Sequence, residues 1–531
     1  MTYPVHRTWT TALMLFACAL AFGLAPSADA RPKARAKARA AAVKSARAPA
    51  AVRPAAASAI ARAPKAETGA EAEDDAAESA APAAPVTRTT DLASDLQAIL
   101  RGASGKSSPY VALIVDAASG KAVLEHDPAK VVYPASVAKL FTTAAAVRTL
   151  DLDRKPTTEV RLVGKGADAE LHVVAVGDPT MTHGDWAKLA AAVQQRGVQK
   201  LRRLVIDASV FDDRLPKGFD EKQTDAAYRA PVGGAMVDAS TLAVAVRPGA
   251  VGAPPIVVVT PDAGGAVTVV NQAQTQAGKG STLAIVTRPA GRGTEVLVTG
   301  VLSVKAKAVG SGRRRVSDAS YFAGWVFKKL LEKQGISVGD PVFAKAAAGE
   351  VVARHQNRDW RAIVAVTNKQ SHNGYAETLF KQVGLALNGA PATNEKAADA
   401  VRKALDGLDI HWEGVRIANG SGLYHADQVT ARAVVDLLRA MARDPKGGEF
   451  RNSLAVGGVD GTLRGRLKGP DTQGKVFAKT GTLDDVSGLA GYAQNGDKAY
   501  VFAFFFNGLK IGPGPLRALQ DRLLRRLLAP G

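Results

Sequence analysis

The sequence has few of the residues that build disulfides or metal centres. Only one of its 531 residues is a cysteine, Cys18, and it lies in the N-terminal leader described below. A mature chain without Cys18 can form neither a disulfide framework nor a cysteine-based metal site. The eight histidines are scattered, and none has the His-x-x-x-His spacing that places two metal ligands on one helix face. We therefore expect neither a bound metal nor a cofactor.

Acidic residues are in the minority, and the formal net charge is +20. Part of this excess lies in residues 31–88, which are rich in Ala, Pro, Lys and Arg and show no apolar periodicity. Such a segment cannot bury enough apolar surface to form a core, so we expect a disordered spacer. Its basic part can contact an anionic polymer or a membrane surface, and the alternative is a flexible, solvated linker.

Residues 1–30 have the organisation of a secretory signal peptide. A basic start at Arg7 precedes the apolar run Thr11–Leu24, which is too short to span a membrane comfortably. Ala28-Asp29-Ala30 then provides a cleavage site. We expect a periplasmic protein that is cleaved after Ala30, and nucleic acid is therefore not an expected partner.

The remaining chain is long enough for two or more domains, and a hydrophobic content of 47% supports a core. Periodicity and turn signals predict a hairpin near the start, an apolar strand in the middle, and a second hairpin with a helix at the end. The segments are Tyr110–Val115 with Lys121–Glu125, Ile363–Val366, Leu489–Gln494 with Tyr500–Phe506, and Leu516–Leu528. Residues 158–315 are rich in strand candidates and predict a mainly β insert.

The last predicted helix is amphipathic. Leu516, Leu519, Leu523 and Leu527 share one face, while arginines lie elsewhere. A basic amphipathic helix can lie on a membrane, but core helices are commoner and this one directly follows two strands. We therefore predict that it packs against the sheet.

The first motif with chemical significance is Ser136-x-x-Lys139, the only Ser-x-x-Lys in the sequence. Pro134 and the Ala-rich residues through Leu150 predict that the motif begins a helix. Helical spacing makes Ser136 and Lys139 neighbours. A serine hydroxyl needs an adjacent base, and a lysine amine serves when burial or nearby positive charge lowers its pKa.

Two later motifs lie where side chains can reach a cleft. Ser371-His372-Asn373 precedes a predicted helix, and Lys479-Thr480-Gly481-Thr482 lies in a predicted strand. Gly481 would allow a ligand to approach the backbone closely. Each motif is weak alone, and the signal is the occurrence of all three in this order.

In that order the motifs resemble the signature of the penicillin-binding proteins and serine β-lactamases. Ser371 follows Lys139 by more than two hundred residues. This spacing is similar to that of the D-alanyl-D-alanine carboxypeptidase/endopeptidase family, the low-molecular-mass class C penicillin-binding proteins, which carry large inserted domains at this point. The resemblance covers residues 91–531 and includes Gly177–Thr180, Ala230-Pro231, Gly420–Leu423 and Gly458–Leu463.

The resemblance and acyl-transfer chemistry together imply a role for each motif. Ser136 would attack the substrate carbonyl, and Lys139 would take its proton. Ser371 would relay a proton to the departing amine, because a hydroxyl both accepts and donates. Asn373 would hold the substrate amide and contact Lys139.

The third motif would bind the substrate carboxylate. Lys479 would supply positive charge, and the hydroxyls of Thr480 and Thr482 would donate hydrogen bonds. By resemblance, the oxyanion hole consists of the backbone N–H groups of Ser136 and Thr482.

The fold class that we expect is α/β (α+β), with a β-lactamase/transpeptidase-like domain and a large, mainly β insert. The catalytic domain would comprise residues 89–157 and 316–531, with a five-stranded antiparallel sheet covered by helices. Residues 158–315 would form the insert.

The resemblance implies a serine D-alanyl-D-alanine carboxypeptidase that acts on peptidoglycan stem peptides through a Ser136 acyl-enzyme. It also implies D-Ala–meso-diaminopimelate endopeptidase activity, and β-lactam antibiotics as covalent inhibitors. Two alternatives remain: a serine β-lactamase, against which the large insert argues, and an inactive wall-binding scaffold, against which the complete set of catalytic side chains argues. His372 replaces the Asp usual in this family, and we expect it to point away from the substrate.

Overall fold

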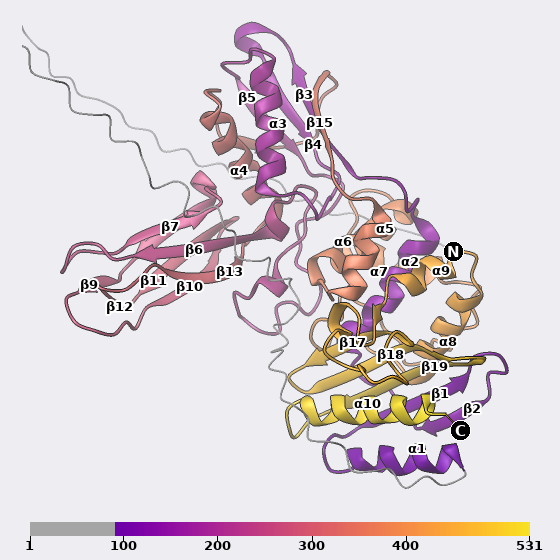
Figure 1. Cartoon of the computed structure of the whole chain (residues 1–531). Helices are drawn as coiled ribbons and strands as arrows, with labels where there is room; N and C mark the ends of the chain where they lie inside the picture. The colour runs from indigo at the N-terminus through magenta and orange to yellow at the C-terminus, as the bar shows by residue number, and fades with distance from the viewer. Residues whose placement is uncertain (1–90, 531) are drawn as a thin grey trace, which may run out of the picture. The chain divides into compact units, whose positions relative to one another are not determined.

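The computed structural model describes residues 91–530 (Figure 1). The predicted signal peptide with Cys18 and the spacer of residues 31–88 lie outside the described residues. Within residues 91–530, no helix combines the length and the apolar composition needed to cross a bilayer. In the same part of the chain, no group of three or more His, Cys, Asp or Glu side chains is arranged to hold a metal ion.

The largest sheet brings together strands from both ends of the described chain. In spatial order its strands are β16 (Ala455–Val456), β17 (Val476–Leu483), β18 (Val486–Asn495), β19 (Lys498–Asn507), β1 (Tyr110–Asp116) and β2 (Ala122–His126). Every neighbouring pair is antiparallel. The sheet therefore has the five strands that were expected, and a two-residue strand, β16, is added at one edge.

Strand β19 shows how the sequence divides the two faces of this sheet. Side chains alternate along a strand, so neighbours point to opposite faces. Phe502 and Phe504 lie in one apolar cluster, whereas Ala503 and Phe505 lie in another. The β18–β19 hairpin turns at Gly496, whose φ of 56° is the positive value that such a tight turn requires.

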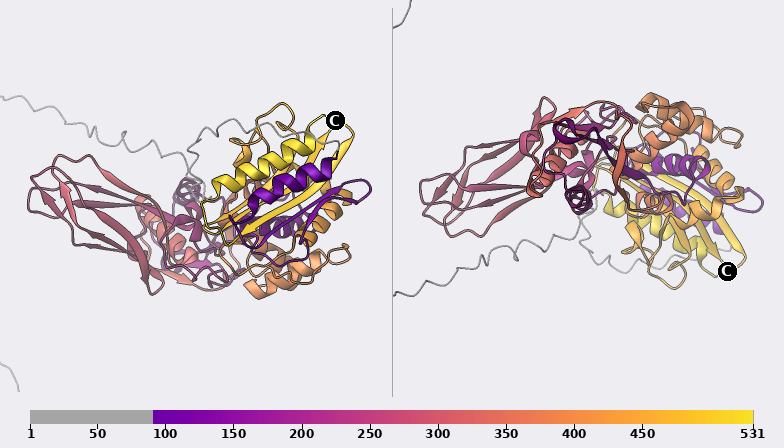
Figure 2. Two further views of the ribbon diagram at one scale, coloured as in Figure 1. Left: turned by 90° about the horizontal axis from the view of Figure 1, so that it is seen from below. Right: turned by 90° about the horizontal axis from the view of Figure 1, so that it is seen from above.

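Two helices cover the face that carries Phe502 and Phe504. Helices α1 (Leu92–Leu100) and α10 (Gly514–Leu528) lie side by side on it (Figure 1, Figure 2). Arg526 Nε donates a hydrogen bond to Asp95 Oδ2 at 2.7 Å and links the two helices. The leucines predicted to face the sheet are all buried there, namely Leu516, Leu519, Leu523 and Leu527. The last helix thus packs against the sheet, as predicted.

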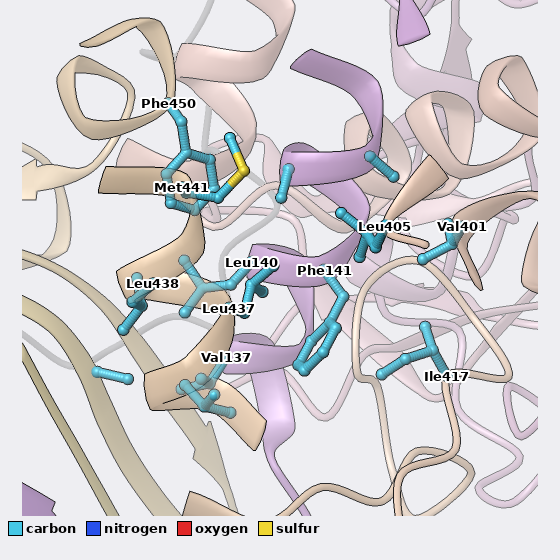
Figure 3. Close-up of a cluster of buried hydrophobic side chains, with 14 of the residues drawn as sticks. Val137, Leu140, Phe141, Val401, Leu405, Ile417, Leu437, Leu438, Met441 and Phe450 are labelled. Carbon is cyan, nitrogen blue, oxygen red and sulfur yellow. The ribbon is translucent and has the colours of Figure 1, made fainter. Parts of the chain in front are cut away.

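The opposite face carries a larger group of helices. They are α2 (Lys139–Thr149), α5 (Trp360–Lys369), α6 (Asn373–Asn388), α7 (Asn394–Ala404), α8 (Ala431–Arg443) and α9 (Gly447–Asn452). Helix α2 is central, with nine buried residues among its 11. Figure 3 shows Leu140 and Phe141 of this helix among side chains of the neighbouring elements, including Leu437 and Ile417. This burial on all sides fixes the position of the first residues of α2.

The strand predicted at Ile363–Val366 is wrong, because these residues lie in the middle of helix α5. The helix begins after Asp359, whose carboxylate accepts a hydrogen bond from the Ala362 N–H at 2.8 Å. A short apolar run is compatible with a buried strand and with a buried helix segment. The N-cap and the buried face of α5 decide between them here.

A second sheet lies between α2 and α5 in the chain. In spatial order its strands are β14 (Pro341–Phe343), β5 (Arg203–Asp207), β4 (Glu170–Val174), β3 (Thr157–Val163) and β15 (Glu350–Gln356). Helices α3 (His183–Gln195) and α4 (Ala319–Lys333) share an apolar cluster with it. Strands β14 and β15 come after residue 315, yet they pair with β5 and β3.

Three small sheets lie within residues 241–315. They are β13 (Val309–Arg315) with β6 (Thr241–Arg247) and β7 (Ile256–Thr260), then β10 (Ala284–Ala290) with β11 (Gly293–Thr299) and β8 (Val267–Asn271), and finally β12 (Val301–Ser303) with β9 (Gln274–Gln276). Their buried valines belong to the same apolar cluster as the second sheet. The segment between the first and second motifs is thus mainly β, as expected.

Candidate active site

The first motif lies in a buried turn at the start of α2. The sequence predicted a first helical turn, and the structure forms a 3₁₀ turn, η2 (Ala135–Ala138), that leads directly into the helix. Ala135 has a φ of 47°, a left-handed conformation that costs a non-glycine residue about 1–3 kcal/mol. Gly422 packs so closely on this turn that an added Cβ would lie 1.9 Å from the Ala135 carbonyl oxygen. The surrounding structure therefore holds Ser136 in one position.

Lys139 is fully buried and lies beside the Ser136 hydroxyl. Its Nζ is 2.8 Å from Ser136 Oγ, 2.7 Å from Asn373 Oδ1 and 2.7 Å from the Ser421 carbonyl oxygen. A neutral amine has two N–H donors and one lone pair. The amide and carbonyl oxygens can accept the two N–H groups, and the lone pair can then accept the Ser136 proton. The geometry suits a lysine that acts as a base toward Ser136.

The second motif lies at the start of α6. Ser371 has a φ of 57°, and its Oγ accepts a hydrogen bond from Lys479 Nζ at 2.9 Å. Asn373 uses both ends of its amide, because Oδ1 faces Lys139 and Nδ2 donates to the Tyr228 carbonyl oxygen at 3.1 Å. The motif therefore joins the two lysines of the site.

His372 takes a structural role between these two residues. Its Nδ1 accepts the Tyr375 N–H at 3.3 Å and caps helix α6, and its ring lies 4.4 Å from the Tyr375 ring. Burial, together with the nearby charge of Lys139, lowers the pKa of His372 to about 4. The imidazole is thus neutral at physiological pH, as its role as a hydrogen-bond acceptor requires.

The third motif lies on β17, next to the turn that carries Ser136. Lys479 is fully buried, and its Nζ also donates to the Thr480 carbonyl oxygen at 2.8 Å. An added Cβ on Gly481 would lie 2.6 Å from the Pro134 carbonyl oxygen, so only glycine lets the strand run this close to the nucleophile turn. The strand therefore brings residues 479–482 to the same place as Ser136.

Two side chains that sequence reasoning did not assign to the site contact this motif. Thr480 Oγ1 donates a hydrogen bond to Thr462 Oγ1 at 2.9 Å, and Arg517 Nη2 donates to Thr482 Oγ1 at 3.1 Å. Thr462 lies in the stretch Gly458–Leu463, whose similarity to the family was a signal. Arg517 carried no such signal, because it is one of several arginines on the polar side of α10.

The carbonyl group that faces Lys139 belongs to a buried loop, Asn419–Gly422. Asn419 Oδ1 accepts the N–H groups of Ser421 and Gly422 at 3.1 and 2.8 Å. Glu377 Oε2 accepts the Gly420 N–H at 3.0 Å. These contacts fix the loop, and with it the Ser421 oxygen beside Lys139.

Two buried carboxyl groups lie behind this loop. Burial raises the pKa of Glu377, and it raises the pKa of Asp427 to about 7. Asp427 Oδ1 accepts the N–H groups of Ala418 and Asn419 at 2.7 and 3.1 Å. Burial favours the neutral form of both groups, and their carboxyl oxygens can accept these N–H groups and hold the loop in either form.

The structure thus brings all the predicted residues of the three motifs to one place. Two serine hydroxyls, Ser136 and Ser371, each lie within hydrogen-bond distance of a buried lysine amine. A serine hydroxyl beside a buried lysine amine is an arrangement that can perform nucleophilic acyl transfer. Fold and site together define a serine acyl-transfer enzyme of the penicillin-binding class.

Comparison with known proteins identifies the family. Residues 92–527 match the model of the D-Ala-D-Ala carboxypeptidase 3 (S13) family, and the chain belongs to this family. The chain is 34% identical to a D-alanyl-D-alanine carboxypeptidase of Actinomadura sp. (strain R39), a match that covers 83% of this chain and 85% of that protein. It is 27% identical to the D-alanyl-D-alanine carboxypeptidase DacB of Haemophilus influenzae, over 71% of this chain and 81% of that one.

A solved structure shares the fold. The crystal structure of penicillin-binding protein 4 from Haemophilus influenzae superposes with a TM-score of 0.72, at 23% identity, and covers 82% of this chain and 99% of that one. These findings confirm the family and the fold class predicted from the motifs. The chain is a serine-type D-Ala-D-Ala carboxypeptidase, a hydrolase of the low-molecular-mass class C penicillin-binding group.

Proposed function

We propose that the enzyme removes the terminal D-Ala from peptidoglycan stem peptides, with Ser136 as nucleophile and Lys139 as its base. The observation that carries this assignment is the 2.8 Å approach of the buried Lys139 Nζ to Ser136 Oγ. A lysine held this way can take the serine proton as the hydroxyl attacks. Asn373 Oδ1 and the Ser421 carbonyl oxygen, which lie beside Lys139 Nζ, are uncharged and do not stabilise the ammonium form as a carboxylate would.

The reaction has two steps. In acylation, Ser136 Oγ bonds to the carbonyl carbon of the penultimate D-Ala, and the bond to the terminal D-Ala nitrogen breaks. Lys139 takes the hydroxyl proton, which passes through Ser371, beside Lys479, to the leaving amine. In deacylation, Lys139 takes a proton from the attacking water and gives it to Ser136 Oγ as the ester bond breaks, which restores Ser136 and Lys139. The N–H groups of Ser136 and Thr482 would stabilise the oxyanion in both steps.

Residues 479–482 would bind the substrate carboxylate. Lys479 provides charge close to Ser371, and the hydroxyls of Thr480 and Thr482 provide directed hydrogen bonds. Gly481 lets β17 lie directly against the turn that carries Ser136, so that the hydroxyls of the strand are brought close to Ser136. Thr480 Oγ1 donates its proton to Thr462 Oγ1 at 2.9 Å, and rotation of the Thr480 hydroxyl would redirect this proton to the carboxylate.

Cleavage of D-Ala–meso-diaminopimelate cross-links belongs to the same proposal. The acyl donor would be the same, and the leaving amino group also lies on a D-centre with a carboxylate. β-Lactam antibiotics would acylate Ser136 as substrate analogues. Family membership favours a carboxypeptidase over a serine β-lactamase, and the hydrogen-bonded motif residues argue against an inactive scaffold.

We also propose where the enzyme works and how its chain is divided. A signal peptide cleaved after Ala30 would deliver it to the periplasm, where residues 31–88 would act as a spacer that can contact an anionic polymer or membrane surface. The division predicted from the sequence assigns residues 89–157 and 316–531 to the catalytic domain and residues 158–315 to the insert. Elements α4, β14 and β15, which follow residue 315, nevertheless pack against or pair with strands of the insert.

Digestion of purified muropeptides, followed by mass spectrometry, tests the proposed activity. The wild-type enzyme is expected to shorten pentapeptide stems by one D-Ala, and cross-linked dimers are expected to yield monomers. Ser136→Ala should abolish both products, whereas Ser104→Ala, at an exposed serine remote from the motifs, should not. Release of D-Ala by Ser136→Ala at the wild-type rate would overturn the assignment.

A further inference from the structure

Arg517 brings a positive charge from the last helix to the edge of the active site. It lies in the first turn of α10, and its Nη2 donates a hydrogen bond to Thr482 Oγ1 at 3.1 Å. Thr482 is the next residue after Gly481, which abuts the Pro134 carbonyl of the nucleophile turn. The guanidinium of Arg517 is therefore one side chain away from the place where the substrate must bind.

The position of Arg517 is fixed by a chain of hydrogen bonds. Arg466 Nη2 donates to the Arg517 carbonyl oxygen at 3.2 Å and to Gln520 Oε1 at 3.0 Å. Gln520 Nε2 donates to Ser487 Oγ at 3.2 Å, and Ser487 stands opposite Thr482 in the β17–β18 pairing. The first turn of α10 is thus tied to the strand that carries Thr482. These contacts hold the backbone of Arg517, and the hydrogen bond to Thr482 directs its guanidinium.

We propose that Arg517 is a specificity-determining residue that recognises the free carboxylate of the substrate's terminal D-Ala together with Thr482. This inference rests on the proposed carboxypeptidase function. Guanidinium groups are well suited to carboxylates because they are planar, always charged and rich in donors. The other cation of this strand, Lys479, is directed toward Ser371 Oγ at 2.9 Å. Lys479 would thus serve the proton relay at Ser371 in addition to supplying positive charge to the site, whereas Arg517 would serve the carboxylate alone.

The contact with Thr482 also orients the threonine hydroxyl. A hydroxyl has one donor site besides its acceptor sites, so Thr482 is able to contact both Arg517 and a carboxylate. The positive charge on one side of the oxygen favours a negatively charged acceptor on the other. A substrate carboxylate meets this requirement, whereas a terminal carboxamide does not.

Kinetics on a matched pair of substrates test the role of Arg517. The pair is a stem-type peptide that ends in D-Ala-D-Ala with a free carboxylate, and the same peptide with a terminal amide. Arg517→Gln is expected to lower kcat/KM for the acid about ten- to a hundredfold, the usual loss for a charged hydrogen bond, and to change the amide by less than about threefold. Arg522→Gln removes the same charge from an exposed position of α10, and it should affect neither peptide.

The possible outcomes separate this inference from the proposed function. Equal losses on both peptides, or no loss on either, would show that Arg517 only anchors α10. A wild-type enzyme that cleaves neither peptide would overturn the proposed function and this inference with it. If thermal unfolding shows that Arg517→Gln is not folded, the same kinetics are measured with Arg517→Lys instead. The proposal is supported if the ratio of kcat/KM for the acid to kcat/KM for the amide is lower in Arg517→Lys than in the wild type. It is contradicted if both values fall and the ratio does not change.

Discussion

Replacing Asn373 with aspartate tests how Lys139 is kept able to act as a base. In the wild-type site the neutral Oδ1 of Asn373 lies 2.7 Å from Lys139 Nζ, and Nδ2 donates to the Tyr228 carbonyl oxygen at 3.1 Å. Aspartate has the same shape but places a negative charge beside the amine. It also turns the contact with Tyr228 into a repulsion between two acceptors.

The carboxylate introduced by Asn373→Asp would stabilise the ammonium form of Lys139 and so lower the fraction of Lys139 that can act as a base. Coulomb's law with an effective dielectric constant of about 20 gives roughly 6 kcal/mol at the 2.7 Å separation. The cost of burying the new carboxylate and its repulsion from Tyr228 offset much of this attraction. A net effect of about 1.4–3 kcal/mol would move the pH needed for acylation upward by one to two units.

The assay is the second-order rate constant for labelling by a fluorescent penicillin, measured as a function of pH. We expect Asn373→Asp to label about ten- to a hundredfold more slowly at pH 7 and to recover at alkaline pH. Asn394→Asp is the control, since Asn394 also donates to a backbone carbonyl, that of Leu215 at 3.0 Å, but lies outside the motifs. A rate that falls equally at every pH would refute the electrostatic reasoning.

Three further changes have defined outcomes. Thr480→Val should lower kcat/KM about ten- to a hundredfold for an acid substrate and less for its amide. Burial opposes protonation of His425, but its hydrogen bonds to Glu221 and Asp485 outweigh burial and raise its pKa. The contribution of His425 to the free energy of unfolding is therefore complete below about pH 6.5 and lost at higher pH. Urea unfolding of His425→Gln should not show this decrease with pH. Leu523→Ala, in the buried face of α10, should lower the free energy of unfolding by about 2–5 kcal/mol.

The sequence alone was sufficient to predict the features that depend on a local pattern of residues. The three motifs, the β18–β19 hairpin and the buried face of α10 each combine a residue type with a spacing that permits few structures. Asn495 before Gly496 is such a case, because few other pairs favour the required turn. The fold class was implied by the family that the order and spacing of the motifs resemble.

Features that depend on distant contacts were not predictable in this way. The run Ile363–Val366 fits a strand as well as a helix, and its N-cap at Asp359 and its packing decided the outcome. The pairing of β15 with β3 joins segments far apart in the chain, and neither carries a register signal of its own.

The site also contains features that a sequence motif does not predict. The oxygen of Ser421 that faces Lys139 is a backbone carbonyl, which every residue has, so no residue type could mark it. The left-handed conformations of Ala135 and Ser371 are imposed by the surrounding structure on residues that do not favour them. The contact between Arg517 and Thr482 exists only because α10 packs against β18, the strand next to β17.

The most direct test of the account is to locate the covalent penicillin adduct. The protein is incubated with benzylpenicillin, digested, and examined by tandem mass spectrometry. The account predicts one penicilloyl group per chain, on Ser136, and no adduct in Ser136→Ala. An adduct on another residue, or a modified chain in the Ser136→Ala variant, would contradict the assignment of Ser136 as the nucleophile.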